Sequence, residues 1–203
     1  MMQRSPTMKS DFTTIDITLR DGRAVHIRAM RPADEAEILQ AFDRLSQDAR
    51  YMRFMRSVRE PNLERVRKTL ASFPGSGLGI VATVPATDGI DIVGTAIFVL
   101  GGDPSTCEFA ITIAADYGGA GLGRTLLTTL VDAAKQRGLK EMEGFVLAAN
   151  KSMLGLAARV GFSISVDPDD RSIRLCRLRL SRGLRGQPTF TWPPVCQRPE
   201  RSP

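Results

Sequence analysis

Four glycines lie close together in the segment 116–124, DYGGAGLGR, at positions 118, 119, 121 and 123. The segment follows a β-rich run and precedes apolar residues at helical spacing, which predicts a strand-to-helix turn. Glycine permits unusual φ angles and close backbone approach, and a helix N-terminus offers unpaired N–H groups and a positive dipole to an anion. The turn is therefore a candidate phosphate-binding site. A plain tight connection is the alternative, and it would need only one or two glycines.

Two common phosphate-binding fingerprints fit this turn poorly. The dinucleotide pattern G-x-G-x-x-G, begun at Gly119, would need its third glycine at Arg124. The P-loop pattern G-x-x-x-x-G-K-[ST] accepts Gly118, Gly123 and Thr125, but an arginine stands where the lysine is required. In addition, no later hydrophobic run ends in an aspartate able to hold Mg²⁺. Both of these cofactor classes are disfavoured.

A second chemical candidate is Glu108, near the start of the β-rich run 107–114. Alternate side chains of a strand share a face, so Glu108 is followed on its own face by the small residues Ala110, Thr112 and Ala114. Small residues leave room for a narrow ligand chain beside the carboxylate. About ten residues separate Glu108 from the glycine turn, on the order of 25–30 Å at ~3.3 Å per residue. The opposite face has the apolar residues expected of a core: Cys107, Phe109, Ile111 and Ile113.

The elements before this site are predicted to be a hairpin, two or three helices and an antiparallel meander. Alternating residues flank Asp21-Gly22, a strong hairpin signal. After Pro32, apolar residues recur at helical spacing, and further helical segments follow. Turn signals separate three β-rich runs that we expect to pair as antiparallel neighbours. The helical segments are expected within 33–55 and 62–73, and the strands at 78–84, 91–100 and 107–114.

The elements after the turn are predicted to alternate between helix and strand. The clearest helix runs from Gly121 to about Arg137 and ends at Gly138. We expect a strand at 142–146, a helix at 151–160 that closes at Gly161-Phe162, and strands near 163–166 and 171–180. This order predicts an α/β (α+β) fold with a mixed sheet.

The chain of 203 residues, 42% of them hydrophobic, is long enough for one domain with its own core. We expect the domain at 13–182. Segments 1–12 and 183–203 are expected to be disordered, the second because it is rich in proline, glycine and arginine without periodicity. No run approaches the ~18 apolar residues of a membrane span, and no secretory signal is visible. We expect a soluble protein that does not act at a membrane.

The cysteines and the single histidine exclude several kinds of site. Cys107, Cys176 and Cys196 show no CxxC pairing, which disfavours a zinc site and favours a reducing cytoplasm. Nucleophilic systems that need imidazole would all have to use His26, which lies in an alternating stretch and is predicted to be an outward strand residue. Cys107 lies on an apolar face without a histidine partner and is disfavoured as a nucleophile. No metal site is expected.

The net charge of +6 is concentrated near the C-terminal end of the chain. From Arg171 onward, eight arginines stand against one acid, Glu200. Such an excess attracts nucleic acid, membrane surfaces or acidic partners, yet only Phe190 and Trp192 there offer rings for stacking. A solvated strand and tail is therefore favoured over a nucleic-acid-binding module.

The sequence resembles the GNAT family of acyl-CoA-dependent N-acyltransferases over about residues 18–180. Gly121 and Gly123, followed by the helix, match the signature [Gln/Arg]-x-x-Gly-x-[Gly/Ala], and Asn150 is a further family mark. The family mark implies that Asn150 hydrogen-bonds amides of the cosubstrate, and the alternative is that it caps the helix that begins at Lys151. The sequence is similar in particular to the GNAT domain of bacterial protein lysine acetyltransferases that act on acyl-CoA synthetases. Four blocks in the same order show this similarity: LRDGRAVHIRAMRPADE, LSQDARYMRFM, CEFAITIAADYGGAGLGRTLL and LAANKSMLGLAARVGF.

The resemblance implies an enzyme that moves an acetyl or other short acyl group from acyl-CoA, normally acetyl-CoA, to a primary amine. A lysine of an acceptor protein, such as an acyl-CoA synthetase, is the preferred acceptor. A small-molecule amine is the alternative, and a non-catalytic acyl-CoA-binding regulator is a second one. The oligomeric state stays open. The implied cosubstrate contacts are Ile111, Ile113, Gly119, Ala120, Gly121, Leu122, Gly123, Arg124 and Asn150.

The resemblance also implies that Glu108, the glutamate that opens the strand before the turn, is the catalytic base. An amine with a pKa of ~10.4 must lose a proton before attack, which costs roughly 4.6 kcal/mol at pH 7 at ~1.36 kcal/mol per unit. A partly buried carboxylate within hydrogen-bond or one-water reach would accept that proton and accelerate transfer by about 10²- to 10⁴-fold. The simpler alternative is a surface glutamate paired with an arginine.

The chain departs from the family pattern at three positions. Gly118 stands where the signature has Gln or Arg, and Ala120 where a basic residue is common. Backbone donors and Arg124 must therefore bind more of the phosphate charge. The tyrosine that many GNAT enzymes use as general acid falls at Ala157, which leaves the general acid unassigned.

Arg50, Tyr51, Arg53 and Phe54 share one predicted helix and are candidates for the substrate entrance. Plain amphipathicity of that helix is the alternative explanation for them.

We predict that residues 186–203 are dispensable for the chemistry, because they show no periodicity and follow the final strand pattern. A protein that ends at Arg185 should fold and keep the acyl-transfer rate of the full chain within about twofold, because chain ends without a periodic pattern usually tolerate truncation. A radiometric transfer assay on both proteins measures this. A truncated protein that folds but loses transfer would contradict the prediction.

Overall fold

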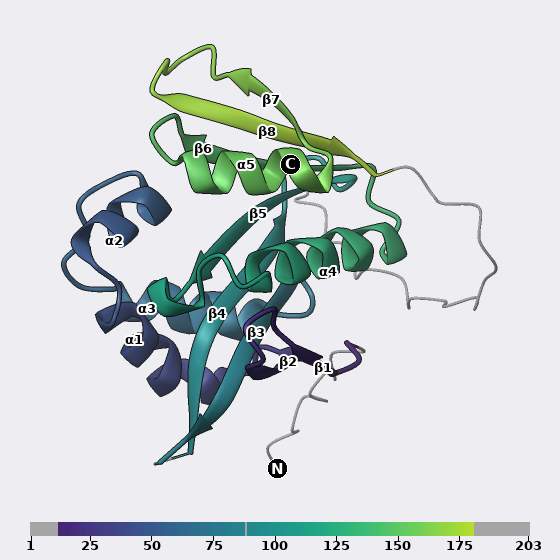
Figure 1. Ribbon diagram of the computed structural model, residues 1–203. Coiled ribbons are helices and arrows are strands. Elements are labelled where there is room, and N and C mark those ends of the chain that lie inside the picture. The colour runs from purple at the N-terminus through teal and green to yellow at the C-terminus, as the bar shows by residue number, and fades with distance from the viewer. Residues whose placement is uncertain (1–11, 88, 181–203) are drawn as a thin grey trace, which may run out of the picture.

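The computed structural model describes residues 12–87 and 89–180 of the chain. Within these residues, one sheet of eight strands has the order β1-β2-β3-β4-β5-β6-β8-β7 (Figure 1). All neighbouring strands are antiparallel except β5 and β6, which are parallel. The strands are β1 (Ile15–Thr18), β2 (Ala24–Ala29), β3 (Gly77–Ala86), β4 (Gly89–Leu100), β5 (Thr106–Ile113), β6 (Glu141–Leu147), β7 (Ser163–Val166) and β8 (Ile173–Arg179).

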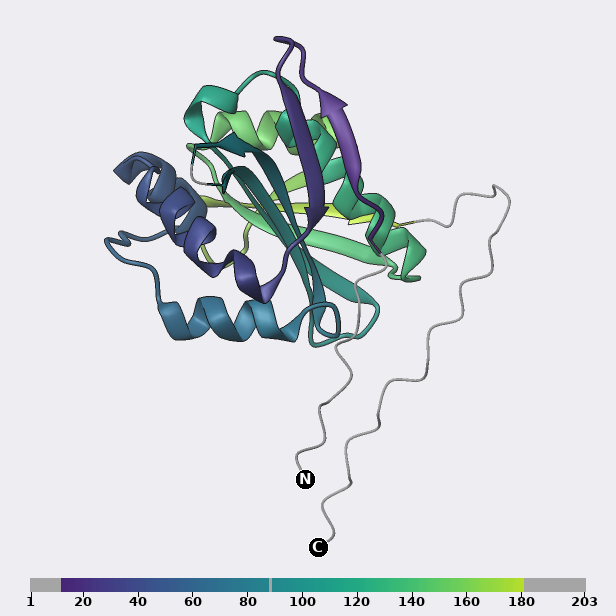
Figure 2. The same ribbon diagram turned by 90° about the horizontal axis from the view of Figure 1, so that it is seen from below.

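Helices cover both faces of the sheet, as Figure 2 shows from below. The helices α1, α2 and α3 lie on one face, and α4 and α5 lie on the other. Two short 3-10 helices, η1 and η2, precede α1 and the glycine turn. The bounds are η1 (Pro32–Asp34), α1 (Glu35–Asp43), α2 (Gln47–Phe54), α3 (Leu63–Ser72), η2 (Ala115–Tyr117), α4 (Leu122–Gln136) and α5 (Lys151–Val160).

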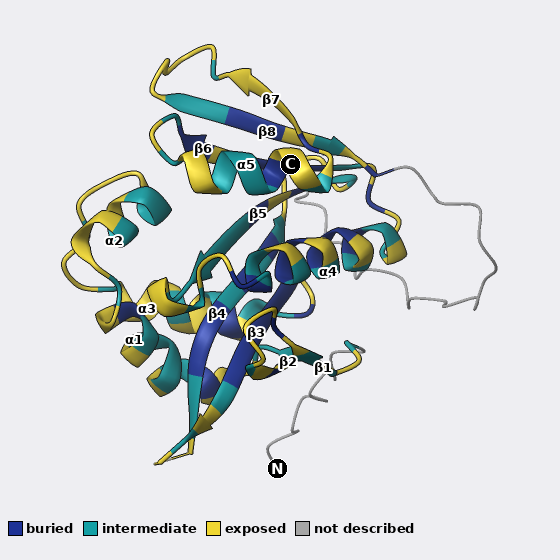
Figure 3. Cartoon of the chain, in the orientation of Figure 1, coloured by how far each residue is buried: buried dark blue, intermediate teal, exposed yellow. Residues whose placement is uncertain are grey.

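The core lies between the central strands and α4, where Figure 3 shows the longest buried stretches. Every third or fourth residue of α4 faces the sheet, which is the spacing that an amphipathic helix needs. This apolar stripe is buried as predicted: Leu122, Leu126, Leu127, Leu130, Val131 and Ala134. Burial of one such leucine stabilises the fold by about 1.5–3 kcal/mol, so the stripe fixes α4 on the sheet.

The entry to α1 is fixed by an ion pair between Arg28 of β2 and Asp34. The two guanidinium Nη atoms donate to the Asp34 carboxylate at 2.8 and 2.7 Å, and the Arg31 backbone N–H donates to the same carboxylate at 2.7 Å. Asp34 is only 5% exposed. Because a buried charge without its partner is costly, this pair holds the start of α1 against the edge of the sheet.

The strands β5 and β6 pair over a short distance and then separate. Only residues Thr106 to Glu108 pair with β6, whereas β5 pairs with β4 as far as Ile113. Phe109 lies where the two strands part, and its ring packs on that of Phe162 with centroids 5.0 Å apart. Over the described part of the chain, the side of β5 that faces β6 is therefore without strand pairing beyond Glu108.

Gly144 of β6 makes room for the Phe109 ring. A Cβ on Gly144 would lie 2.5 to 2.8 Å from three atoms of that ring. Only glycine lets β6 approach β5 closely enough to pair and still accommodate Phe109.

The expectations for the fold are confirmed, with two features that the sequence did not give. The hairpin around Asp21-Gly22, the helices, the meander and the mixed sheet all form as predicted. The parallel pairing of β5 with β6 and the insertion of β8 between β6 and β7 were not predicted, because both depend on contacts between distant segments. The predictions for segments 1–11 and 181–203 lie outside the described residues.

Within the described residues, no helix is both long and apolar enough to cross a membrane.

We predict that Gly144→Ala destabilises the protein by about 1–3 kcal/mol, because the added methyl group overpacks the Phe109 ring. The matched control is Gly102→Ala, since a Cβ on Gly102 would meet no atom within 4 Å. Urea unfolding of the two variants and the parent protein measures the difference. Equal stability of the two variants would contradict the packing account.

Candidate active site

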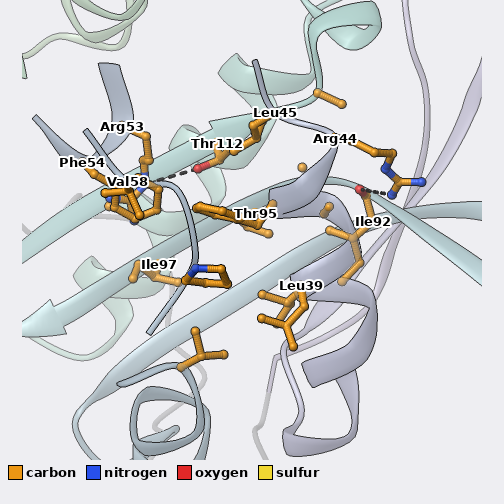
Figure 4. Close-up of a pocket in the computed structure, with 18 of the residues that line it drawn as sticks. Leu39, Arg44, Leu45, Arg53, Phe54, Val58, Ile92, Thr95, Ile97 and Thr112 are labelled. Atoms are coloured by element: carbon orange, nitrogen blue, oxygen red, sulfur yellow. Dashed lines mark hydrogen bonds between the residues drawn. The ribbon is translucent and has the colours of Figure 1, made fainter. Parts of the chain in front are cut away.

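Two cavities meet at β5. The strand-gap cavity, of ≈ 370 Å³, lies where β5 and β6 separate and is lined by residues 108–113, Phe145, Val146 and side chains of α2 and α5. The helix-covered cavity, of ≈ 670 Å³, lies under α1, α2 and α3 and is drawn in Figure 4. Both cavities have walls from β5 and α2, so a group at their junction is accessible from both cavities.

Glu108 lies at this junction. It is the last β5 residue paired with β6, and its side chain lines both cavities. Among the described residues, it is the one carboxylate that does so. The partial burial expected for Glu108 is wrong, because the residue is exposed. Its position follows from the strand: with Cys107 and Phe109 buried in the core, the alternation turns the glutamate outward.

Thr112 and Arg53 lie farther along β5. The Arg53 Nε donates to the Thr112 Oγ1 at 3.1 Å, which Figure 4 shows as a dashed line. Burial lowers the pKa of Arg53 to about 10, the charge of Glu108 opposes this shift, and Arg65 adds to it. The guanidinium is still charged at neutral pH, so a cation and a carboxylate face the same space.

The two faces of β5 do not divide as cleanly as expected. Cys107 and Phe109 are buried, but Ile111 and Ile113 are only half-buried and line the strand-gap cavity. Their assignment to the core is thus wrong in part, because the separation of β6 removes the neighbour that would cover them. The small residues Ala110, Thr112 and Ala114 line the helix-covered cavity.

Cys107 carries a thiol that does not reach either cavity. Its side chain lies in the hydrophobic core and the residue is 1% exposed, and burial raises the pKa of the thiol to about 12. A protonated, buried thiol is a poor nucleophile, which agrees with the expectation from the sequence.

The glycine turn uses two residues in the left-handed region, Gly119 at φ 76° and Gly121 at φ 102°. The second is the N-cap of α4, which begins at Leu122. Helices α2, α3 and α5 have a side chain that accepts a backbone N–H at the N-cap, from Ser46, Asn62 and Asn150. Helix α4 has no such cap and no acid in its first turn, which leaves its N–H groups open to an anion.

The other predicted residues of the turn differ in their surroundings. Ala120 and Leu122 are buried, with 8% and 0% exposure, so only their backbone can meet a ligand. Arg124 is exposed. A Cβ on Gly123 would lie 3.2 Å from Leu156, which lines the strand-gap cavity. The turn and this cavity are therefore neighbours.

Asn150 caps a helix and lines a cavity. Its Oδ1 accepts the Met153 backbone N–H at 3.1 Å, and the residue belongs to the wall of the strand-gap cavity. The capping alternative considered from the sequence is thus observed, and it leaves the amide group at the cavity wall.

The candidates for the substrate entrance separate into two groups. Arg53 and Phe54 line the helix-covered cavity, whereas Tyr51 is 47% exposed outside it. Arg50 stacks on Phe42 and donates to three backbone carbonyls, which is a structural role. The sequence predicted Thr112 only as a small residue on the Glu108 face, since nothing local indicates that a distant arginine would bind it.

His26 and Ala157 line neither of the two cavities. His26 is an exposed β2 residue whose Nδ1 lies 2.6 Å from the Asp16 carboxylate, and it lines neither cavity. Ala157, where the family tyrosine would fall, is fully buried in α5. Over the described part of the chain, no group of three or more His, Cys, Asp or Glu side chains could hold a metal ion.

Comparisons with known proteins agree with this architecture. The family model described as "Acetyltransferase (GNAT) domain" matches residues 25–163. The chain is 32% identical over 163 residues to Acetyltransferase PA5475 of Pseudomonas aeruginosa, covering 80% of this chain and 88% of that protein.

Solved structures show the same fold. The GNAT domain of the PAT of S. lividans superposes with a TM-score of 0.75 at 18% identity, over 82% of this chain and 97% of that one. The acetyltransferase yncA of Salmonella typhimurium, solved with its cofactor acetyl-CoA, has a TM-score of 0.61 at 21% identity, over 80% and 97% of the two chains.

The family model covers more than half of the chain, and the glycine turn and all residues that line the two cavities lie within the matched range 25–163. The chain belongs to the GNAT family of acetyltransferases, which use acetyl-CoA as cosubstrate.

Proposed function

We propose that this acetyltransferase transfers the acetyl group of acetyl-CoA to a protein lysine, with Glu108 as the general base. The observation that carries the proposal is the position of Glu108 at the junction of the two cavities. A base must reach the acceptor amine while that amine reaches the thioester. A carboxylate that lines both spaces meets this requirement.

The cosubstrate belongs in the strand-gap cavity and on the glycine turn. The pyrophosphate is placed on the backbone N–H groups of residues 119–124, where α4 begins without a cap. The pantetheine arm then runs past Ile111, Ile113 and Asn150 towards Glu108. Beyond Glu108, no strand of the described residues pairs with the β6-facing edge of β5, so its backbone groups are open to the amides of this arm.

The acceptor amine enters from the helix-covered cavity. Glu108 takes a proton from the ammonium group, directly or through one water, and the free amine attacks the thioester carbonyl carbon. A C–N bond forms, the C–S bond breaks, the nitrogen loses its second proton as the amide forms, and CoA leaves as a thiolate that takes up a proton. The group that supplies this proton is unassigned, since the position of the family tyrosine is the buried Ala157.

A protein lysine is preferred because the sequence blocks resemble protein lysine acetyltransferases, and an acyl-CoA synthetase is the partner that this resemblance favours. A small-molecule amine is the second candidate. Its support is the volume of the helix-covered cavity, ≈ 670 Å³, which lies within the ~300–1,000 Å³ range of small-ligand sites. A cytoplasmic setting fits the buried free cysteines Cys107 and Cys176.

Incubation with labelled acetyl-CoA and a lysate separates the two acceptor classes. Label on a lysine of a discrete protein supports the preferred acceptor, and label confined to small molecules supports the alternative. Any transfer above a heat-treated control excludes the non-catalytic acyl-CoA-binding regulator.

We predict that Gly121→Val abolishes acetyl-CoA binding, because valine is strained at φ 102° and distorts the start of α4. The matched control is Gly138→Val at the other end of α4, where φ is 77° and a Cβ would meet nothing within 4 Å. Both variants carry similar strain, but only the first should lose binding in calorimetry. Unchanged affinity in a folded Gly121→Val protein would place the phosphates elsewhere.

We predict that Glu108→Gln keeps acetyl-CoA binding but lowers turnover at neutral pH by roughly 10² or more, because the proton acceptor is removed. The rates of the two proteins should converge towards pH 10, where a lysine with a pKa of ~10.4 supplies free amine by itself. A pH–rate profile from pH 7 to 10 measures this.

The matched control for Glu108→Gln is Glu143→Gln. Glu143 is the register partner of Glu108 on β6, but it pairs with Arg177 at 3.3 Å and lines neither cavity. This variant should keep the parent rate within about threefold, as a surface ion pair contributes only ~0–1 kcal/mol. A Glu108→Gln deficit that stayed constant up to pH 10 would show that Glu108 orients the substrate and is not the base.

A further inference from the structure

We propose that Arg20, in the turn between β1 and β2, binds the pyrophosphate of acetyl-CoA and supplies a cation that the glycine turn lacks. The inference rests on the proposed position of the pyrophosphate at residues 119–124. It adds a residue from a segment about 100 positions earlier in the chain, as the numbering shows.

The turn between β1 and β2 lies against the glycine turn. The Arg20 backbone N–H donates to the Ala120 carbonyl at 3.1 Å. The Arg20 side chain extends along Gly121: its Nε, Cγ and Cδ lie 3.7, 3.9 and 4.0 Å from the point that a Cβ on Gly121 would occupy. The guanidinium group is therefore beside the N-cap of α4.

Three further contacts fix this placement. Leu19, directly before Arg20, is 5% exposed and belongs to the core. Arg23 stacks over the Tyr117 ring at 3.8 Å, and one of its Nη atoms donates to the Asp116 carbonyl at 2.7 Å. Because the backbone of the turn is fixed on both sides of Arg20, ligand binding would cost little conformational entropy in this turn.

The charges near the turn leave Arg20 open to an anion. Arg23 is engaged by Asp21, whose carboxylate it binds at 2.6 and 3.0 Å. Within the described part of the chain, by contrast, no carboxylate forms an ion pair with Arg20, and its side chain is exposed. Residues 118–123 have no charged side chain, and Arg124 is the one cation in the first turn of α4. A diphosphate with two negative charges would thus have Arg20 on the hairpin side and Arg124 on the helix side.

The test measures binding of three ligands to four proteins by calorimetry. The ligands are acetyl-CoA, acetyl-dephospho-CoA, which keeps the pyrophosphate but lacks the 3′-phosphate, and acetyl-pantetheine, which has neither. The proteins are the parent, Arg20→Ala, Arg20→Lys and the control Arg171→Ala, whose arginine is exposed in the loop between β7 and β8. Thermal unfolding of each protein confirms that it is folded.

We expect Arg20→Ala to weaken acetyl-CoA and acetyl-dephospho-CoA binding by about tenfold each and to leave acetyl-pantetheine binding within twofold, because only the first two carry the pyrophosphate. Arg20→Lys should lose less than Arg20→Ala, since it keeps the charge. Arg171→Ala should bind all three ligands as the parent does.

Three results would overturn the proposal. Equal weakening of all three ligands in a folded Arg20→Ala protein would mean that Arg20 only supports the fold. A loss confined to acetyl-CoA would assign Arg20 to the 3′-phosphate. If the parent itself bound acetyl-CoA no more tightly than acetyl-pantetheine, the turn would not hold the phosphates at all, and the proposed position of the cosubstrate would fail together with this inference.

Discussion

The short pairing between β5 and β6 is the constraint on which the site depends. Three residue pairs join the two halves of the sheet before the strands separate. A longer ladder would satisfy the backbone groups of residues 109–113 and close the strand-gap cavity. Without any β5–β6 pairing, the strands β6, β8 and β7 would not be hydrogen-bonded to the rest of the sheet. Phe109 and Gly144 determine where the pairing ends, because the Phe109 ring lies where the strands separate and Gly144 leaves room for it.

The proposed phosphate-binding end of the site depends on the missing side-chain cap at the N-terminus of α4. A helix without an N-terminal cap leaves N–H groups unsatisfied, which costs stability unless water or a ligand binds them. Here the buried stripe of α4 supplies enough apolar contact to hold the helix without a cap. The N-terminus is thus free for a ligand, and the β1–β2 turn presses against it through the contact of Arg20 with Ala120. In α4, the N-terminal N–H groups are thus available for binding, while the apolar stripe along the helix packs on the sheet.

The proposed acceptor end of the site combines a carboxylate and a cation in different environments. Glu108 is exposed at the junction of the cavities, whereas Arg53 is desolvated enough to lower its pKa to about 10. The two side chains come from β5 and α2, and α2 contacts β5 and β6 on the face opposite α4. The helices that form the helix-covered cavity therefore also determine the electrostatic surroundings of the proposed base.

The secondary-structure elements and the local chemistry of the chain can be predicted from its sequence. Hairpin, meander and helices follow from hydrophobic spacing and turn residues within a few positions of each other, and the structure has them at nearly the predicted bounds. The same holds for the glycine turn, for the outward direction of Glu108 and for the capping role of Asn150, because φ preference, strand alternation and helix capping are local properties.

The way in which these elements contact one another could not be predicted from the sequence. The parallel β5–β6 pairing, its early end, and the half-burial of Ile111 and Ile113 depend on the distance between strands that lie about thirty residues apart in the chain. The contacts of Arg53 with Thr112 and of Arg20 with Ala120 join segments separated by 59 and about 100 residues. Periodicity and propensity report on the immediate neighbours of a residue, and they contain no information about which distant edge, ring or carbonyl the fold will bring against it.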